Sequence, residues 1–183
     1  MGPFDNSEPA GRIHPYAADW TDTQVVRRTG DKLQLPQNLT EWVPVGTLVQ
    51  WIGEEVSALD WETHFLQFVQ PPPEYRPRIL LSILCFASCI GIFGASEIIA
   101  CCHSEPAFQD LCEKKVPFPD ELDHFRRANR TMLETVLYRV FLRLTRHHKG
   151  LGSEPLSPSV DDYLRCKAVE RLDISRHVNT WDE

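Results

Sequence analysis

Apolar residues recur at helical spacing over most of the chain between residues 44 and 151. The first such run extends from Pro44 to Leu59, and it tolerates Gly53 inside the predicted helix at some cost in helix propensity. Its apolar face consists of Leu48, Val49, Ile52, Val56 and Leu59. Three consecutive prolines at positions 71–73 then interrupt the pattern, and Pro77 suits the first turn of a second helix. The pattern predicts one helix on each side of the prolines.

The second helix lies in a stretch of about eighteen uncharged residues between Arg78 and Glu97, which approaches the length of a membrane span. Gly91 and Gly94 shorten it, and a helix that ends near Gly91 measures only about 20 Å. The polar atoms of Ser82, Ser88, Cys85 and Cys89 dilute its apolar character further. A helix surrounded by other helices is apolar on all sides without meeting lipid. We therefore predict a buried helix, with a single-pass membrane segment as the less favoured alternative.

The pattern after Gly94 predicts further helices. Ser96 and Ser104 are candidate N-caps of two short helices, and Pro119 can open a helix that reaches Asn129. The sequence from Thr131 to Glu134, TMLE, has the spacing of a capping box. The helix after it has a long apolar face, made of Leu133, Val136, Leu137, Val140, Phe141 and Leu144. No run alternates as a strand would, so we expect an all-α fold.

These elements divide the chain into three predicted parts. Residues 1–40 are rich in Pro, Gly, Asp, Asn and Arg without apolar periodicity, which is typical of an irregular arm. Residues 41–151 form a compact multi-helix domain. Residues 152–183 form a tail with one short helix, whose apolar edge consists of Val160, Tyr163, Leu164 and Val169.

Positive charge is concentrated in one segment of an acidic chain. The 183 residues carry a net charge of −7, yet seven basic and three acidic residues give the segment from Glu121 to Gly150 a net charge of +4. The remaining residues therefore carry −11. Such segregation favours a local basic face for DNA, whereas the alternative is an arginine face that packs against the acidic remainder of the fold.

Composition and cysteine spacing narrow the possible chemistry. No basic and then apolar run of a signal peptide is present at the N-terminus, and six cysteines lack the spacing of a secreted scaffold, so we expect a cytoplasmic protein with reduced thiols. Neighbouring ligand side chains in Cys101, Cys102 and His103 point apart, and no paired C-x-x-C motif exists. We therefore predict buried structural thiols, no metal and no cofactor. His147 and His148, also adjacent, are expected to be solvated at a helix end.

Five blocks of sequence carry a family resemblance. EWVPVGTLVQWIGEEVSALDW, YRPRILLSILCFASCIGIFGASEI, AFQDL, VPFPDELDHFRRANR and the Gly150-Leu151 pair occur in order between about Trp42 and Leu151. Together they resemble the N-terminal domain of InsH-type insertion-sequence transposases. The resemblance implies a helical domain that takes part in DNA transposition, with double-stranded DNA at the ends of the element as its partner. It also implies that the apolar segment is the core helix of a soluble domain.

The sequence departs from that family at several positions and lacks room for its catalytic domain, which limits the activity that we expect of this chain. Ser96 and Ala100 stand where the family usually has basic residues, and Phe118 and the Glu121-Leu122 pair replace other usual residues. Family transposases continue into an RNase-H-like catalytic domain that binds two metal ions. Only about thirty residues follow Leu151, too few for such a domain, so we predict no enzyme activity for this chain by itself.

The candidate DNA-binding residues form two groups on consecutive predicted helices. One group ends the block with the strongest resemblance and the other forms a stripe at i, i+4 and i+7 on the following helix; the residues are Arg126, Arg127, Arg130, Arg139, Arg143 and Arg146. Arg126 has an alternative role, because its neighbour Phe125 is apolar and Asp123 or Glu121 offers a carboxylate. The helix to Asn129 and the one before it, from Ser104 to Cys112, are a candidate helix-turn-helix-like pair.

Two other functions remain open besides DNA binding. The chain is alternatively a helical protein-interaction module that self-associates or pairs with, and inhibits, a full-length transposase. A membrane protein is the third and least favoured class.

Overall fold

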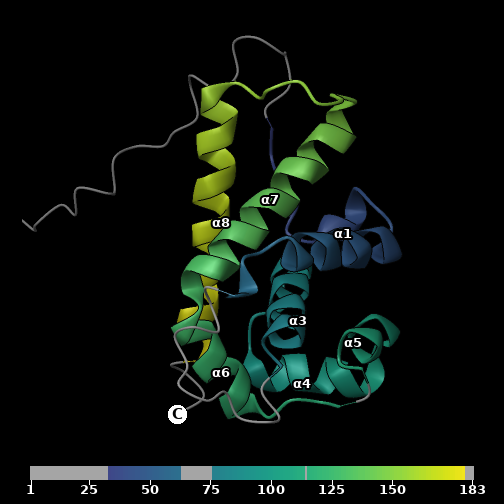
Figure 1. The fold of residues 1–183 in the computed structure, drawn as a ribbon, viewed down its shortest axis with the longest axis vertical. Coiled ribbons are helices and arrows are strands. Elements are labelled where there is room, and N and C mark those ends of the chain that lie inside the picture. The colour runs from purple at the N-terminus through teal and green to yellow at the C-terminus, as the bar shows by residue number, and fades with distance from the viewer. Residues whose placement is uncertain (1–32, 63–75, 114, 180–183) are drawn as a thin grey trace, which may run out of the picture. The chain divides into compact units, whose positions relative to one another are not determined.

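The computed structural model describes residues 33–62, 76–113 and 115–179, with the side chains of residues 176–179 left aside. This part of the chain contains helices and no strand, so the predicted all-α class is confirmed. Figure 1 shows the elements, which follow one another as η1 (Leu39–Glu41), α1 (Val45–Ser57), α3 (Pro77–Ile90), α4 (Ala95–Ser104), α5 (Pro106–Leu111), α6 (Pro119–Ala128), α7 (Arg130–Lys149) and α8 (Pro158–Asn179).

Helix α3 is the central element of the core. Every side chain from residue 80 to residue 89 is buried, and the helix packs against α1, α5, α6, α7 and α8. It ends at Gly91, which caps the helix in the left-handed region with φ of 83°. The prediction of a buried helix that ends at this glycine is therefore confirmed.

Among the described residues, no single helix has both the length and the apolar character needed to cross a membrane. Helices α3 and α4 meet that requirement only when counted together, and the chain bends by 99° between them.

Helices α7 and α8 form the most extensive helix pair, and in Figure 1 they lie close together near the start of α7 and diverge towards its end. All six predicted apolar positions of α7, from Leu133 to Leu144, are buried. The expected short helix of the tail is wrong in length, because α8 has 22 residues. Its buried side chains Leu164, Ala168 and Leu172 recur every four residues and therefore face α7 together, whereas Val169 is exposed.

The predicted boundaries at residues 40 and 151 also differ from those of the structure. The compact unit that contains the helices extends from Gln34 to Glu183. Leu35 and Leu39 are buried in it, and so is one side of α8. Buried apolar side chains thus extend the core beyond both predicted boundaries, although they are too sparse in the sequence to show periodicity. The rest of the predicted arm, residues 1–32, lies outside the described residues.

The predicted helix starts are right where proline sets them and wrong where a hydroxyl was expected to cap. Helices α3 and α6 begin with Pro77 and Pro119. Helix α4 begins after Gly94, and Ser104 lies inside its last turn, where its hydroxyl donates to the carbonyl of Ala100. Helix α7 begins at Arg130 rather than at the TMLE segment, because Asn129 alone separates it from α6 and no loop precedes Thr131.

The predicted helix-turn-helix-like pair does not form between α5 and α6. Helix α5 packs against α4, α1 and α3, whereas α6 packs against α3, α4 and α7. The two helices therefore share α3 and α4 as neighbours but do not pack against each other as an extensive pair.

Candidate nucleic-acid interface

Arg126 is part of the fold rather than of an open basic surface. Its side chain is only 11% exposed. One guanidinium nitrogen donates to the carbonyl of Phe93 at 3.0 Å, and the other lies 3.5 Å from both Asp123 and the carbonyl of Ser175. Burial lowers the pKa of this guanidinium, which the charge of Asp123 opposes. The alternative role foreseen for Arg126, an ion pair with Asp123, is confirmed.

Arg130, at the start of α7, is held by two carboxylates. Its Nε donates to Glu134 at 2.8 Å, one turn further along α7, and Nη2 donates to Asp173 of α8 at 2.8 Å. The hydrogen bond to Asp173 is the main reason why the pKa of Arg130 is raised. Arg130 therefore joins α7 to α8 and has two intramolecular partners in place of phosphate.

Arg139 and Arg143 lie on the side of α7 that adjoins α1. Arg143 donates to Glu54, and its guanidinium lies 4.7 Å from the centre of the Trp51 ring. Arg139 lies 3.9 Å from Glu55. The hydrogen bond from Arg143 lowers the pKa of Glu54, and a second bond from Gln50 adds to this effect. Both arginines nevertheless remain substantially open to solvent, with side chains 41% and 37% exposed.

Arg127 and Arg146 have no ion-pair partner among the described residues. Arg127 is exposed on the last turn of α6, and Arg146 is half-buried near the end of α7. The Nε of Arg146 is buried and has no hydrogen-bond partner in the described part of the chain. These two side chains are separated by almost the whole length of α7, so they do not form one local patch.

The six predicted arginines are thus not one uniform basic face. Four of them pair with carboxylates of α1, α6, α7 or α8: Arg126, Arg130, Arg139 and Arg143. Three carboxylates from the acidic remainder of the chain, those of Glu54, Glu55 and Asp173, therefore pair with arginines of the basic segment. Among the six, Arg139, Arg143 and Arg146 lie within seven residues of α7 and are partly exposed, with Arg139 and Arg143 on the side that adjoins α1.

An aromatic cluster that sequence reasoning missed lies where the end of α7 meets η1 and α1. The imidazole of His148 stacks on the indole of Trp42, with ring centres 3.9 Å apart and planes 5° from parallel. His147 meets Trp51 edge to face at 5.4 Å. Both histidines are exposed, as predicted, but each also covers a tryptophan. The only sequence signal was two tryptophans nine residues apart, Trp42 just before the first predicted helix and Trp51 inside it, and nothing local linked them to His147 and His148.

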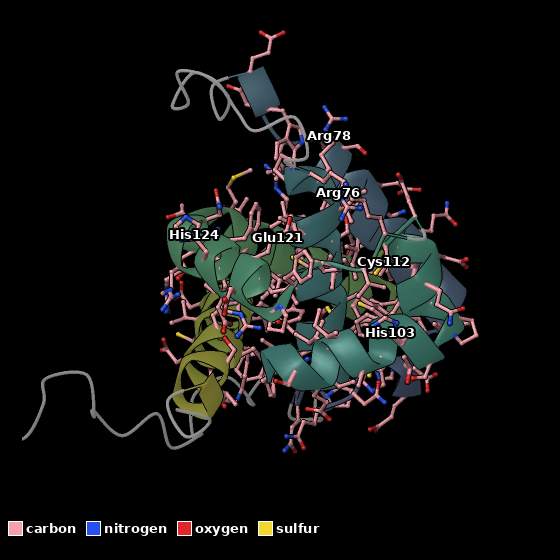
Figure 2. The ribbon with its side chains drawn as sticks, turned by 90° about the horizontal axis from the view of Figure 1, so that it is seen from below. Arg76, Arg78, His103, Cys112, Glu121 and His124 are labelled. Atoms are coloured by element: carbon pink, nitrogen blue, oxygen red, sulfur yellow. The ribbon has the colours of Figure 1, made fainter. Side chains whose placement is uncertain are left out.

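The cysteines are mostly buried thiols, as predicted. Burial raises the pKa of Cys89 to about 12 and raises that of Cys85 as well. Cys102 and Cys112 are also buried, whereas Cys166 is exposed. Figure 2 shows Arg76 beside Cys112; the guanidinium of Arg76 donates to the carbonyls of Cys112 and Lys115. Within the described residues, no three His, Cys, Asp or Glu side chains gather as metal ligands would.

Comparison of the chain with protein-family models, with curated proteins and with solved structures finds no match.

Proposed function

We propose that the helical unit binds double-stranded DNA through the partly exposed arginines on the α1 side of α7, as a DNA-binding domain of a transposase-like protein that performs no catalysis by itself. The observation that carries the proposal is the stripe of Arg139, Arg143 and Arg146 on a single 20-residue helix. From Arg139 to Arg146 the stripe spans about 10 Å along the helix axis, so its side chains can reach neighbouring phosphates of a duplex. Arginine suits such contacts because its planar guanidinium binds phosphate through two nitrogens.

The ion pairs of the stripe are compatible with this role. Exposed pairs between arginine and glutamate are generally worth about 0–1 kcal/mol, because water and salt screen them. Arg139 and Arg143 can therefore exchange Glu55 and Glu54 for phosphate at small cost. Arg126, which is buried, and Arg130, which has two carboxylate partners, are not included in the proposed contact surface. Arg127 stays a predicted contact on α6.

The family resemblance supports the same proposal from the sequence. Its main blocks correspond to separate elements of one compact unit: the first to α1, the second to α3 and the start of α4, and the fourth to α6. In the sequence, the resemblance covers contiguous stretches rather than scattered residues.

The test is the salt dependence of DNA binding by the double variant Arg139→Gln/Arg143→Gln. Each lost phosphate contact reduces the slope of log affinity against log salt by about one unit, so we expect the slope to fall by about two. The double variant Arg165→Gln/Lys167→Gln removes the same charge from α8, and it should keep the wild-type slope. Binding is measured by fluorescence anisotropy with a labelled duplex, and melting curves show that each variant is folded.

A second pair of substitutions tests the same surface with the opposite sign. Glu54→Gln/Glu55→Gln removes two carboxylates that compete with phosphate, so affinity for the duplex should rise. Unchanged slopes in the arginine variant, or lack of salt-sensitive binding by the wild-type protein at micromolar concentration, would contradict the proposal.

The rival function is a helical protein-interaction module. The observation in its favour is Phe118, whose side chain is 77% exposed between Pro117 and Pro119 at the start of α6. A protein that fails to bind DNA but self-associates through Phe118 in sedimentation experiments would support this rival.

A further inference from the structure

The stacked pair of Trp42 and His148 presents an aromatic surface to solvent. Trp42 follows η1 directly and is half-buried, whereas His148 is exposed. Because one face of the imidazole lies flat on the indole at 3.9 Å, the exposed area of His148 consists of its opposite face and its edges. The tryptophan supports the imidazole from behind and fixes the plane of the ring.

Two basic residues and two carboxylates belong to the same end of α7 and the elements it meets. Lys149 is exposed next to His148, and Arg143 lies over Trp51, which His147 also touches. Glu54 pairs with Arg143, and the exposed Glu41 precedes Trp42 in the chain. The cluster thus combines a flat, exposed ring with a basic neighbour in sequence, Lys149, at the end of the helix that carries the arginine stripe.

That combination matches the requirements of an unpaired nucleobase. Proteins bind single-stranded nucleic acid by stacking bases on aromatic or histidine rings while nearby cations contact the backbone phosphates. A paired base inside a duplex offers no free face, so such a surface discriminates in favour of unpaired bases. A cation alone would bind the phosphates of paired and unpaired strands alike, so it would not provide this discrimination.

We propose that the exposed face of His148 stacks with an unpaired base of single-stranded DNA, such as the base at a frayed end of the duplex that α7 contacts. The inference rests on the proposed function, because the unpaired base belongs to the DNA that α7 is proposed to bind. It concerns a separate property, the preference for unpaired over paired bases. Trp42 acts as a positioning residue that holds the imidazole plane, and Lys149 contacts the adjacent phosphate.

The test compares three ligands of known composition: a twelve-residue oligothymidylate, an abasic oligonucleotide with the same number of phosphates, and a blunt duplex. Wild-type protein should bind the oligothymidylate more tightly than the abasic strand. Stacking of one base is worth about a fivefold or larger change in affinity, so His148→Ala should weaken oligothymidylate binding by at least that factor. Binding of the abasic strand should change much less, because that strand has no base to stack.

Two further variants separate stacking from charge and from damage to the fold. His148→Phe keeps a flat ring without a titratable nitrogen, so it should retain the affinity for oligothymidylate. His103→Ala removes an exposed histidine at the end of α4, labelled in Figure 2, and should leave all three affinities unchanged. Melting curves establish that each variant is folded.

The outcomes distinguish the two proposals. Equal binding of oligothymidylate and abasic strand, or equal loss in His148→Ala and His148→Phe, would overturn the stacking inference while leaving duplex binding intact. Oligothymidylate binding that depends on His148 without any duplex binding would support the inference and overturn the proposed function. Binding of none of the three ligands would overturn both.

Discussion

Arg171 carries a positive charge into the interior of the helical unit. Its guanidinium donates to the carbonyl of Ser88 at 2.6 Å and to that of Pro36 at 2.5 Å, and it lies 5.1 Å from the centre of the Phe141 ring. Burial lowers the pKa of this side chain. One residue of α8 thereby joins α3, α7 and the segment before η1.

Replacement of this arginine should destabilise the fold. Arg171→Met keeps much of the volume but removes the donor to the buried carbonyl of Ser88 and to the half-buried carbonyl of Pro36, so we expect the free energy of unfolding to fall by about 2–4 kcal/mol. Urea unfolding followed by circular dichroism measures the change. Arg165→Met is the matched control, because Arg165 lies on the same helix with its side chain 59% exposed, and its effect should be small. Similar unfolding midpoints for the two variants would contradict the structural role of Arg171.

At the residue scale, the sequence predicted local partners but no distant ones. The ion pair between Arg126 and Asp123 was foreseen because the two residues lie three positions apart on one helix. The bonds of Arg171 were not, because their acceptors are 83 and 135 residues away. The same distance along the chain concealed the stack of His148 on Trp42 and the ion pair of Arg143 with Glu54.

At the scale of single elements, two glycines play different roles: one ends a helix and the other lies inside one. Gly91 ends α3 with φ of 83°, a conformation that costs a residue with a side chain about 1–2 kcal/mol. Gly53 lies inside α1, where an added Cβ would meet no atom within 4 Å. The first glycine is needed for the chain to leave the core, whereas the second only lowers helix propensity.

Alanine substitutions at these two positions should therefore shift stability in opposite directions. Gly53→Ala should raise the free energy of unfolding by about 0.5–1 kcal/mol, because glycine is the poorer helix former. Gly91→Ala should lower it by about 1–2 kcal/mol through backbone strain alone, since its Cβ would make only ordinary contacts with Gln37. Thermal melts of both variants measure the shifts. A Gly91→Ala variant at least as stable as Gly53→Ala would show that the left-handed cap is dispensable.

Apolar periodicity and proline predicted α1, α3, α6 and α7 well, since both signals are local. The hydroxyl caps at Ser96, Ser104 and Thr131 failed because capping depends on where the preceding loop ends, which packing decides. The length of α8 was underestimated because its buried face is only partly apolar in sequence. Its buried face consists of Leu164, Ala168 and Leu172 together with Arg171, so neither alanine nor arginine marked it as apolar.

At the scale of the whole molecule, α8 belongs to the core rather than to a tail. It covers α7 along its buried side and reaches α3 through Arg171. Tyr138 of α7 donates to Asp161, and Arg165 lies over the Tyr138 ring, so polar contacts extend the same interface towards the start of α8.

A chain that ends at Ser157 should consequently lose its cooperative fold. Truncation exposes the apolar side of α7 and removes buried leucines worth about 2–5 kcal/mol each, which together match the total stability of a small domain. A chain that ends at Asn179 retains α8 and serves as the control, which should melt like the full chain. Melting by circular dichroism compares them, and a wild-type transition in the shorter chain would mean that residues 34–157 fold without α8.

The contacts of α8 with residues 35 and 36 also have a consequence for the order of folding. The backbone amide of Leu35 donates to the hydroxyl of Tyr163, and Pro36 accepts from Arg171, across 128 and 135 positions of sequence. Contacts at such separation form slowly, because the loop between them must close before they contribute. During synthesis, the segment around Leu35 must wait for Arg171, so the earliest part of the helical unit to be made is among the last to reach its native partners.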